Sequence, residues 1–397
     1  MRSVLKTEEL CVGYGKKEIV SGISQEIIKG QFVSILGPNG SGKTTILKTL
    51  AKVIAPLRGR IYINGLLLDR LSSKEVAKNL SVVLTERPSP GLLTAFEFVA
   101  LGRYPYTDIF GRLTEKDKEK IKEALQLVNA KELSERYFGE LSDGERQKLV
   151  IARAIAQEPE IIILDEPTIH LDPKNKIELL GILYRLSKKK GVTVLVSLHD
   201  IDVASRISDL VLLVKEGRII DFGPPEKVIN QERIAQLYDL KDVHFNSKLY
   251  TFELLKNNKR KDIFVIAGAG TGTPLYRTLL RHGFGIVTGI IHENDIDFHV
   301  ANSMKVEVVS ERAFQKIGKN TLKKAFSFIA HAKAVIDSDF PVGSFNRENI
   351  DLIHYAIKKE KKAYTLRKKK EAYELYGNLS KKLIYLNDVY SFLEERR

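Results

Sequence analysis

Cysteine is nearly absent from this sequence, since Cys11 is the single one among 397 residues. A disulfide framework is therefore excluded, and a reducing compartment is expected. Long apolar runs are also missing, because no stretch approaches the roughly 18 consecutive apolar residues of a membrane span. The first ten residues, MRSVLKTEEL, lack the apolar segment of a signal peptide. We therefore expect a chain that stays in the cytosol.

Acidic residues are outnumbered, with 50 Asp and Glu against 64 Lys and Arg, which gives a formal net charge of +14. Such a charge would suit nucleic acid or an anionic membrane surface. Much of the excess lies in short runs, Lys188–Lys190 and Arg367–Lys370, which are typical of solvated helix faces. Tyr364, Tyr373 and Tyr376 stand among lysines and leave a nucleic-acid surface as the less favoured alternative. We expect no nucleic-acid partner.

A glycine-rich loop, GPNGSGKTT, follows the apolar run Phe32–Leu36 and precedes apolar residues at helical spacing. Strand, loop and helix in this order form the setting of a phosphate-binding loop. Backbone N–H groups and the helix N-terminus would surround an anion, Lys43 would reach the β- and γ-phosphates, and Thr44 would ligate Mg²⁺. The predicted nucleotide-binding residues of this loop are Gly37, Pro38, Asn39, Gly40, Ser41, Gly42, Lys43, Thr44 and Thr45.

Two adjacent carboxylates end a second apolar strand, Ile161–Leu164. Buried carboxylates are costly unless a cation pairs with them, and nucleotide-bound Mg²⁺ would supply that cation. Asp165 is predicted to hold the ion, usually through water, and Glu166 to act as general base toward the attacking water. His199, just past the following apolar strand, is predicted to contact the γ-phosphate.

Two further motifs could contact a nucleotide. Tyr14 lies in a turn ahead of the phosphate loop and could stack on an adenine ring. A Ser-x-Gly turn, Ser142 to Gly144, opens a long helix and offers a hydroxyl and backbone N–H groups to an anion. The same turn can also be an ordinary helix N-cap.

The ordered motifs GPNGSGKTT, LSDGE, IIILDEPT, HLD and SLHD, within residues 1 to about 240, resemble the ATP-binding subunit of ABC transporters. The resemblance implies an α/β P-loop NTPase domain with a helical subdomain at about 87–155. It also implies a homodimer that sandwiches two ATP molecules, with Ser142 and Gly144 contacting the γ-phosphate held by the partner's Lys43. Asp172 would communicate across that interface. Implied partners are two integral membrane permease subunits and, indirectly, a substrate-binding protein, which places the chain at the cytoplasmic face of the membrane.

The sequence departs from the common pattern of this family at two places. Asp143 and Glu145 replace the usual Gly and Gln of the signature, and Glu86 replaces a glutamine that normally reaches Mg²⁺. A carboxylate can still bind that ion, so Glu86 remains a metal-ligand candidate. The block Val99–Tyr106, followed by Phe110–Leu113, looks like importers of iron–siderophore complexes, haem and cobalamin.

An ATP-hydrolysing importer subunit is thus the expected function, with ATP and Mg²⁺ as cofactors. A soluble ABC ATPase acting on nucleic acid or ribosomes is the alternative. The segment between Lys43 and Ser142 is too short for the long coiled coil of the DNA-repair type. The translation type has two cassettes in one chain, and only one set of motifs is present.

A second domain is expected at 256–397, after the ATPase domain at 1–255, because a basic junction there is followed by strands alternating with helices. This alternation predicts a small Rossmann-like parallel sheet that binds ligand beyond the strand ends. Its glycine loop nearly matches G-x-G-x-x-G, but Thr273 occupies the third glycine. The candidate ligand residues are Gly268, Gly270, Thr271, Gly272, Glu293 and Asp337. We expect a small-molecule sensor that adjusts transport; an enzyme domain that processes the imported cofactor and, less favoured, a pyridine-dinucleotide site are the alternatives.

Overall fold

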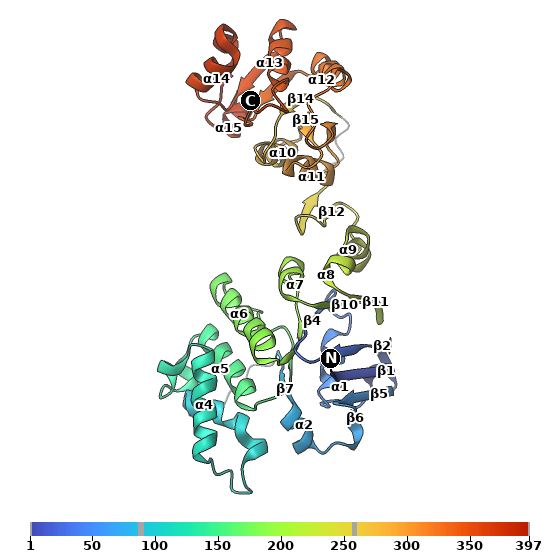
Figure 1. Ribbon diagram of the computed structural model, residues 1–397, viewed down its shortest axis with the longest axis vertical. Helices are drawn as coiled ribbons and strands as arrows, with labels where there is room; N and C mark the ends of the chain where they lie inside the picture. Colours follow the sequence, from blue (N-terminus) through green and yellow to red (C-terminus); the bar gives the residue numbers. More distant parts are fainter. Residues whose placement is uncertain (1, 86–90, 256–259, 396–397) are drawn as a thin grey trace. The chain divides into compact units, whose positions relative to one another are not determined.

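The computed structural model describes residues 2–85, 91–255 and 260–395. The chain divides into two compact units, Met1–Asp239 and Leu240–Arg397, called here the first and second units (Figure 1). No helix in the described ranges is long and apolar enough to cross a bilayer.

A six-stranded mixed sheet forms the centre of the first unit. Its order is β11 (Arg218–Gly223), β10 (Leu210–Lys215), β4 (Phe32–Leu36), β9 (Thr193–Ser197), β8 (Ile161–Leu164) and β7 (Leu80–Val83). Every pairing is parallel except that of β11 with β10. Strands β4, β8 and β9 are buried along their whole length, as expected for parallel strands covered on both faces. The carboxyl ends of these three strands therefore meet at one edge of the sheet.

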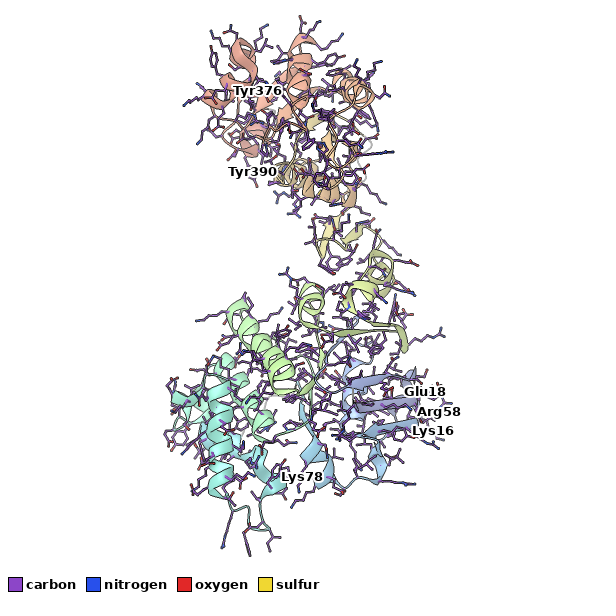
Figure 2. All side chains as sticks on the ribbon, viewed as in Figure 1. Lys16, Glu18, Arg58, Lys78, Tyr376 and Tyr390 are labelled. Atoms are coloured by element: carbon purple, nitrogen blue, oxygen red, sulfur yellow. The ribbon has the colours of Figure 1, made fainter. Side chains whose placement is uncertain are left out.

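An antiparallel sheet packs on the same core. It contains β1 (Ser3–Tyr14), β2 (Lys17–Ile23), β3 (Glu26–Ile28), β5 (Arg58–Ile63) and β6 (Leu66–Leu67). Its buried aliphatic residues join those of β4, β8 and α1 (Lys43–Leu50) in one hydrophobic cluster. At one edge of this sheet Lys16, Glu18 and Arg58 lie together, and Glu18 pairs with Arg58 (Figure 2).

Helices supply the rest of the first unit. In the described ranges these are α2 (Ser73–Asn79), α3 (Ala95–Ala100), α4 (Glu115–Leu127), α5 (Asp143–Ala156), α6 (Pro173–Lys190), α7 (Ile201–Ile207), α8 (Pro225–Val228) and α9 (Gln231–Tyr238). Helices α3, α4 and α5 form the helical region expected from the sequence. Thr94, Thr114 and Ser142 begin these three helices with capping boxes, which satisfy two backbone donors each.

The second unit contains a six-stranded, fully parallel sheet. Its order is β16 (Glu307–Glu311), β15 (Ile286–His292), β14 (Ile263–Ile266), β17 (Ala334–Asp337), β18 (Lys362–Thr365) and β19 (Ile384–Tyr385). The connecting helices are α10 (Gly272–Arg281), α11 (Ile296–Ser303), α12 (Lys319–His331), α13 (Asn349–Lys358) and α14 (Lys369–Tyr376), and α15 (Val389–Glu394) follows the last strand. In chain order the strands run 3-2-1-4-5-6, the order of the doubly wound dinucleotide-binding fold. Its topological switch point lies between β14 and β17.

The two compact units divide after Asp239, 16 residues before the boundary expected from the sequence at 255. The hairpin of β12 (Val243–Asn246) and β13 (Thr251–Leu254) belongs to the second unit. Asn246 Nδ2 donates to Ser303 Oγ at 2.9 Å and to the carbonyl of His299 at 3.2 Å. The buried Glu253 pairs with Arg277 of α10. The composition of the chain changes only at the later basic run, and the long-range contacts of the hairpin leave no mark on it.

Candidate active site

The phosphate loop joins β4 to α1, and its shape depends on glycine. Gly42 has φ +105°, and a Cβ there would lie 2.3 Å from Cγ2 of Val20. Lys43 is buried, and its Nζ donates to the carbonyls of Gly37 at 2.9 Å and Pro38 at 3.1 Å. Burial lowers the pKa of Lys43, while the carboxylates at 165 and 166 oppose that shift. The loop therefore holds its lysine close to where a phosphate would lie.

Asp165 lies at the carboxyl end of β8 and is buried. Its Oδ2 accepts hydrogen bonds from Thr44 Oγ1 at 2.8 Å and from Thr85 Oγ1 at 3.0 Å. Its Oδ1 accepts from Ser197 Oγ at 2.8 Å. Three hydroxyls from α1, the end of β7 and β9 thus fix the orientation of the carboxylate.

Glu166 and His199 form the second pair of the site. His199 Nε2 lies 2.8 Å from Glu166 Oε1, and the backbone N–H of Glu166 donates to Ser197 Oγ at 2.8 Å. Glu166 has φ +50°, a backbone conformation that non-glycine residues adopt mainly where the surroundings enforce it, often at functional sites. A cavity of about 60 Å³ lies beside Asp165 and Glu166 and extends to the start of α5. The geometry places a base, Glu166, beside a cavity with room for water.

The residues present fit a magnesium-bound nucleotide. Thr44 and Asp165 offer the oxygen ligands that Mg²⁺ prefers, and they already lie within hydrogen-bond distance of each other. The Ser41 hydroxyl is buried and has no hydrogen-bond partner among the described residues, so it is available to bond a phosphate oxygen. Glu86, the third expected metal ligand, lies outside the described residues.

Ser142, Gly144 and Asp172 form a separate group at the starts of α5 and α6. The Ser142 hydroxyl accepts from Glu145 N at 3.4 Å, and Asp172 Oδ1 accepts from Asn175 N at 2.9 Å. A Cβ at Gly144 would lie 2.7 Å from Nδ2 of Asn175, so the two helix starts are in close contact. In Figure 1, α5 and α1 lie on opposite sides of β4 and β7. The hydrogen bonds of Ser142 and Asp172 stay at their own helix starts, whereas Lys43 and Thr44 bond to the loop carbonyls and to Asp165, so the two sets form separate groups of contacts.

Tyr14 ends β1 and is about half exposed, at 51%, so its ring has a free surface for stacking. Two residues of the site were missed from the sequence. Ser197 and Thr85 hold the Asp165 carboxylate. A serine inside an otherwise apolar strand and a threonine at a strand end were the available signals.

The predicted ligand residues of the second unit are largely engaged with the protein itself. Asp337 is fully buried, and its Oδ2 accepts from Thr365 Oγ1, Arg367 Nε and Tyr376 Oη at 2.8 to 3.0 Å. Thr271 Oγ1 lies 2.6 Å from Ser338 Oγ at the switch point. We conclude that Asp337 fixes the loop after β17, because its carboxylate is enclosed by protein donors.

Glu293 is exposed after β15, and its N–H donates to the carbonyl of Glu311. The acid that contacts the glycine loop is Asp295, two residues further along, whose Oδ2 accepts from Ala269 N at 2.7 Å. Tyr364 and Tyr376 are buried, as Figure 2 shows for Tyr376 within the second unit. Stacking on nucleic acid through these two rings is thereby excluded.

Comparison with known proteins agrees with this geometry. The ABC transporter family model matches residues 20–169, and the MJ0874 family model matches residues 286–393. An uncharacterized ABC transporter ATP-binding protein of Methanocaldococcus jannaschii, MJ0873, is 50% identical over 288 residues, covering 72% of this chain and 99% of that protein. The iron(3+)-hydroxamate import ATP-binding protein FhuC of Bacillus subtilis is 37% identical, covering 64% of this chain and 97% of that protein.

Solved structures of ABC transporter cassettes are also similar to this chain. CbiO1 of Clostridium perfringens, part of the ABC transporter complex cbiONQ, has a TM-score of 0.52 at 28% identity and covers 61% of this chain and 96% of its own. A dimeric ATP-binding cassette, MJ0796 bound to ADP and phosphate, has a TM-score of 0.50 at 28% identity, covering 56% of this chain and 98% of its own. With its phosphate loop, paired carboxylates and histidine in place, this chain belongs to the ABC transporter ATP-binding family and is an ATPase.

Proposed function

We propose that this chain powers a membrane importer of iron(3+)–siderophore chelates, working as two copies beneath two membrane subunits. The observation that carries the proposal is the connected set of contacts from Thr44 through Asp165 and Ser197 to Glu166 and His199. Relatives named as import ATP-binding proteins for iron(3+)-hydroxamate and ferric enterobactin support the iron–chelate cargo.

Each residue of the set has a distinct task in hydrolysis. Lys43 and the loop N–H groups hold the β- and γ-phosphates, and bound magnesium would neutralise phosphate charge at Thr44 and Asp165. Glu166 would accept the proton of the attacking water, and His199, 2.8 Å away, orients the Glu166 carboxylate and would contact the γ-phosphate of a bound nucleotide.

Two copies are needed because the signature turn and the phosphate loop form separate groups in one chain. In the dimer, Ser142 and Gly144 of one copy would complete the site around Lys43 of the other. The dimeric relative supports this arrangement. A site completed only on closure couples ATP binding to a large movement, which a transporter can use.

A groove on the first unit is suited to the membrane subunits. It lies between α2, β7 and α5, has a volume of about 390 Å³, and is lined by Val76, Leu101 and Arg153 among others. Leu101, which lines its helical side, is 51% exposed. We propose that a short helix of a membrane subunit docks there, since Leu101 and Gly102 of the block Val99–Tyr106, which looks like that of iron–chelate importers, line this side.

Dimerisation is tested with the Glu166→Gln chain, which should hold ATP without hydrolysing it. Light scattering of the ATP-loaded variant is expected to show a dimer, and Ser142→Arg on the same background should remain monomeric. A monomer at high concentration, both alone and with the membrane subunits, would overturn the two-copy site.

The cargo is tested by ATP turnover of the complete transporter in vesicles. A ferric hydroxamate with its binding protein is expected to stimulate turnover, whereas haem and cobalamin should not. Stimulation by either of these two alone would assign a different cargo while leaving the ATPase intact.

A further inference from the structure

The second unit has the fold of a dinucleotide-binding domain, but its phosphate position is already filled. In sheets of this strand order, a pyrophosphate lies at the N-terminus of the helix after the first strand. Here that helix is α10, which follows β14 through the loop Gly268–Thr271. Helix α11 lies beside α10 and brings two carboxylates to this loop (Figure 1).

Asp297 of α11 is fully buried and binds the start of α10. Its Oδ2 accepts from the N–H of Gly272 at 2.9 Å, and its Oδ1 accepts from the N–H and the hydroxyl of Thr273 at 2.8 and 2.7 Å. Asp295 Oδ2 accepts from the N–H of Ala269 at 2.7 Å. These N–H groups are the donors that a phosphate would use.

The residues that depart from the dinucleotide fingerprint agree with carboxylates of the protein itself lying at this position. Thr273 stands where the third glycine is expected, and its hydroxyl binds Asp297. A Cβ at Gly272 would lie 2.3 Å from the Tyr276 hydroxyl and 2.5 Å from Cβ of Ala267. Close packing of α10 on its sheet therefore accounts for Gly272, and no approaching phosphate is needed to explain it.

We propose that Asp297 and Asp295 take the place of a bound phosphate, so that the second unit binds no dinucleotide at α10. An incoming phosphate would have to displace the buried Asp297 and would meet the charge of Asp295. Burial raises the pKa of Asp297, although bonds from Gly272 and Thr273 oppose that shift.

The first test is dinucleotide binding by the full chain, with ADP filling the site of the first unit. NADH fluorescence is the probe, and the protein contains no tryptophan that would complicate it. No saturable signal is expected. Saturable NADH binding that NAD⁺ displaces would overturn the proposal.

The second test removes the Asp297 carboxylate and offers a free anion in its place, again with ADP present. Asp297→Gly is expected to lower the melting midpoint of the second unit, and sulfate should restore part of the loss in a saturable way. Because sulfate stabilises folded proteins in general, the control is Asp388→Gly, which removes an exposed N-cap carboxylate from α15.

A sulfate effect on Asp297→Gly that exceeds the effects on the control and on the unchanged chain supports the proposal, and equal effects overturn it. If Asp297→Gly does not fold, Asp297→Ser is measured in the same way. The NADH measurement on the unchanged chain decides the question even if neither variant folds.

Discussion

At the scale of single residues, the pair Glu166 and His199 makes the sharpest prediction. Glu166→Gln keeps the shape of the side chain but removes the proton acceptor, so ATP turnover should fall by roughly 10² to 10⁴-fold. Binding of ATP should persist, because Lys43 and the loop are unchanged. Phosphate release and binding of a fluorescent ATP analogue measure the two effects.

The matched control is Asp202→Asn, which neutralises a half-exposed acid on α7. Its turnover should equal that of the unchanged chain. Full turnover by Glu166→Gln would show that another group accepts the proton.

Single residues also show where prediction from sequence ends. Lys43, Asp165 and Glu166 were predicted because each stands at a fixed place in a strand-and-loop motif. The role of Asp297 could not be predicted, because the residues around it give no sign that its carboxylate binds Thr273 of α10, 24 residues earlier in the chain. Glu293 was chosen for its place at a strand end, yet the acid that contacts the loop is Asp295.

At the scale of elements, helix α4 depends on one carboxylate with two tasks. Asp117 accepts from Thr114 N in the capping box and from Arg103 Nε at 2.9 Å, and the Arg103 and Asp117 side chains are only 3% and 5% exposed. Burial alone would raise the pKa of Asp117, but these hydrogen bonds outweigh burial and hold the pKa below its usual value. The ionised carboxylate therefore stabilises the fold.

Asp117→Asn should lower the free energy of unfolding of the first unit by about 3 kcal/mol at neutral pH, the scale of breaking a buried ion pair. The lowered pKa means that the unfolded chain takes up the proton first. The stabilisation is complete above the ordinary aspartate pKa of about 3.9 and is lost as the pH falls through the lower folded value.

Denaturant unfolding of both chains across this pH range measures the difference. Glu119→Gln, an exposed change on the same helix, is the control and should leave stability unchanged. If the difference in unfolding free energy between Asp117→Asn and the unchanged chain stayed constant down to the lowest pH, the role of the Asp117 charge would be contradicted.

The sequence predicts the helices and strands better than it predicts the contacts between them. Alternating apolar runs and helical patterns predicted the parallel sheet of the second unit, and the structure confirms it. The boundary expected at 255 leaves the hairpin β12–β13 with the first domain, whereas Asn246 and Glu253 attach it to helices that come later in the chain. Polar residues in a short strand carry no local sign of such long-range partners.

At the scale of the whole molecule, each unit has a core of its own. The residues of the ATP site lie in the first unit, and its hydrophobic cluster around β4 and α1 contains no residue of the second. The cassette ends with α9, whose C-cap Asp239 pairs with Lys215 of β10. Folding and basal ATP hydrolysis should therefore need nothing beyond this residue.

Two truncated chains test this boundary. A chain ending at Asp239 should fold, hydrolyse ATP at the basal rate and resist protease up to its end. A chain ending at Leu255 retains the hairpin but loses Arg277, His299 and Ser303, the partners of its Glu253 and Asn246. An isolated two-stranded hairpin is marginally stable, so limited proteolysis should cleave within 240–255 in this chain and spare the same segment in the full chain. Protection of that segment in the chain ending at Leu255 would return the boundary to the later position.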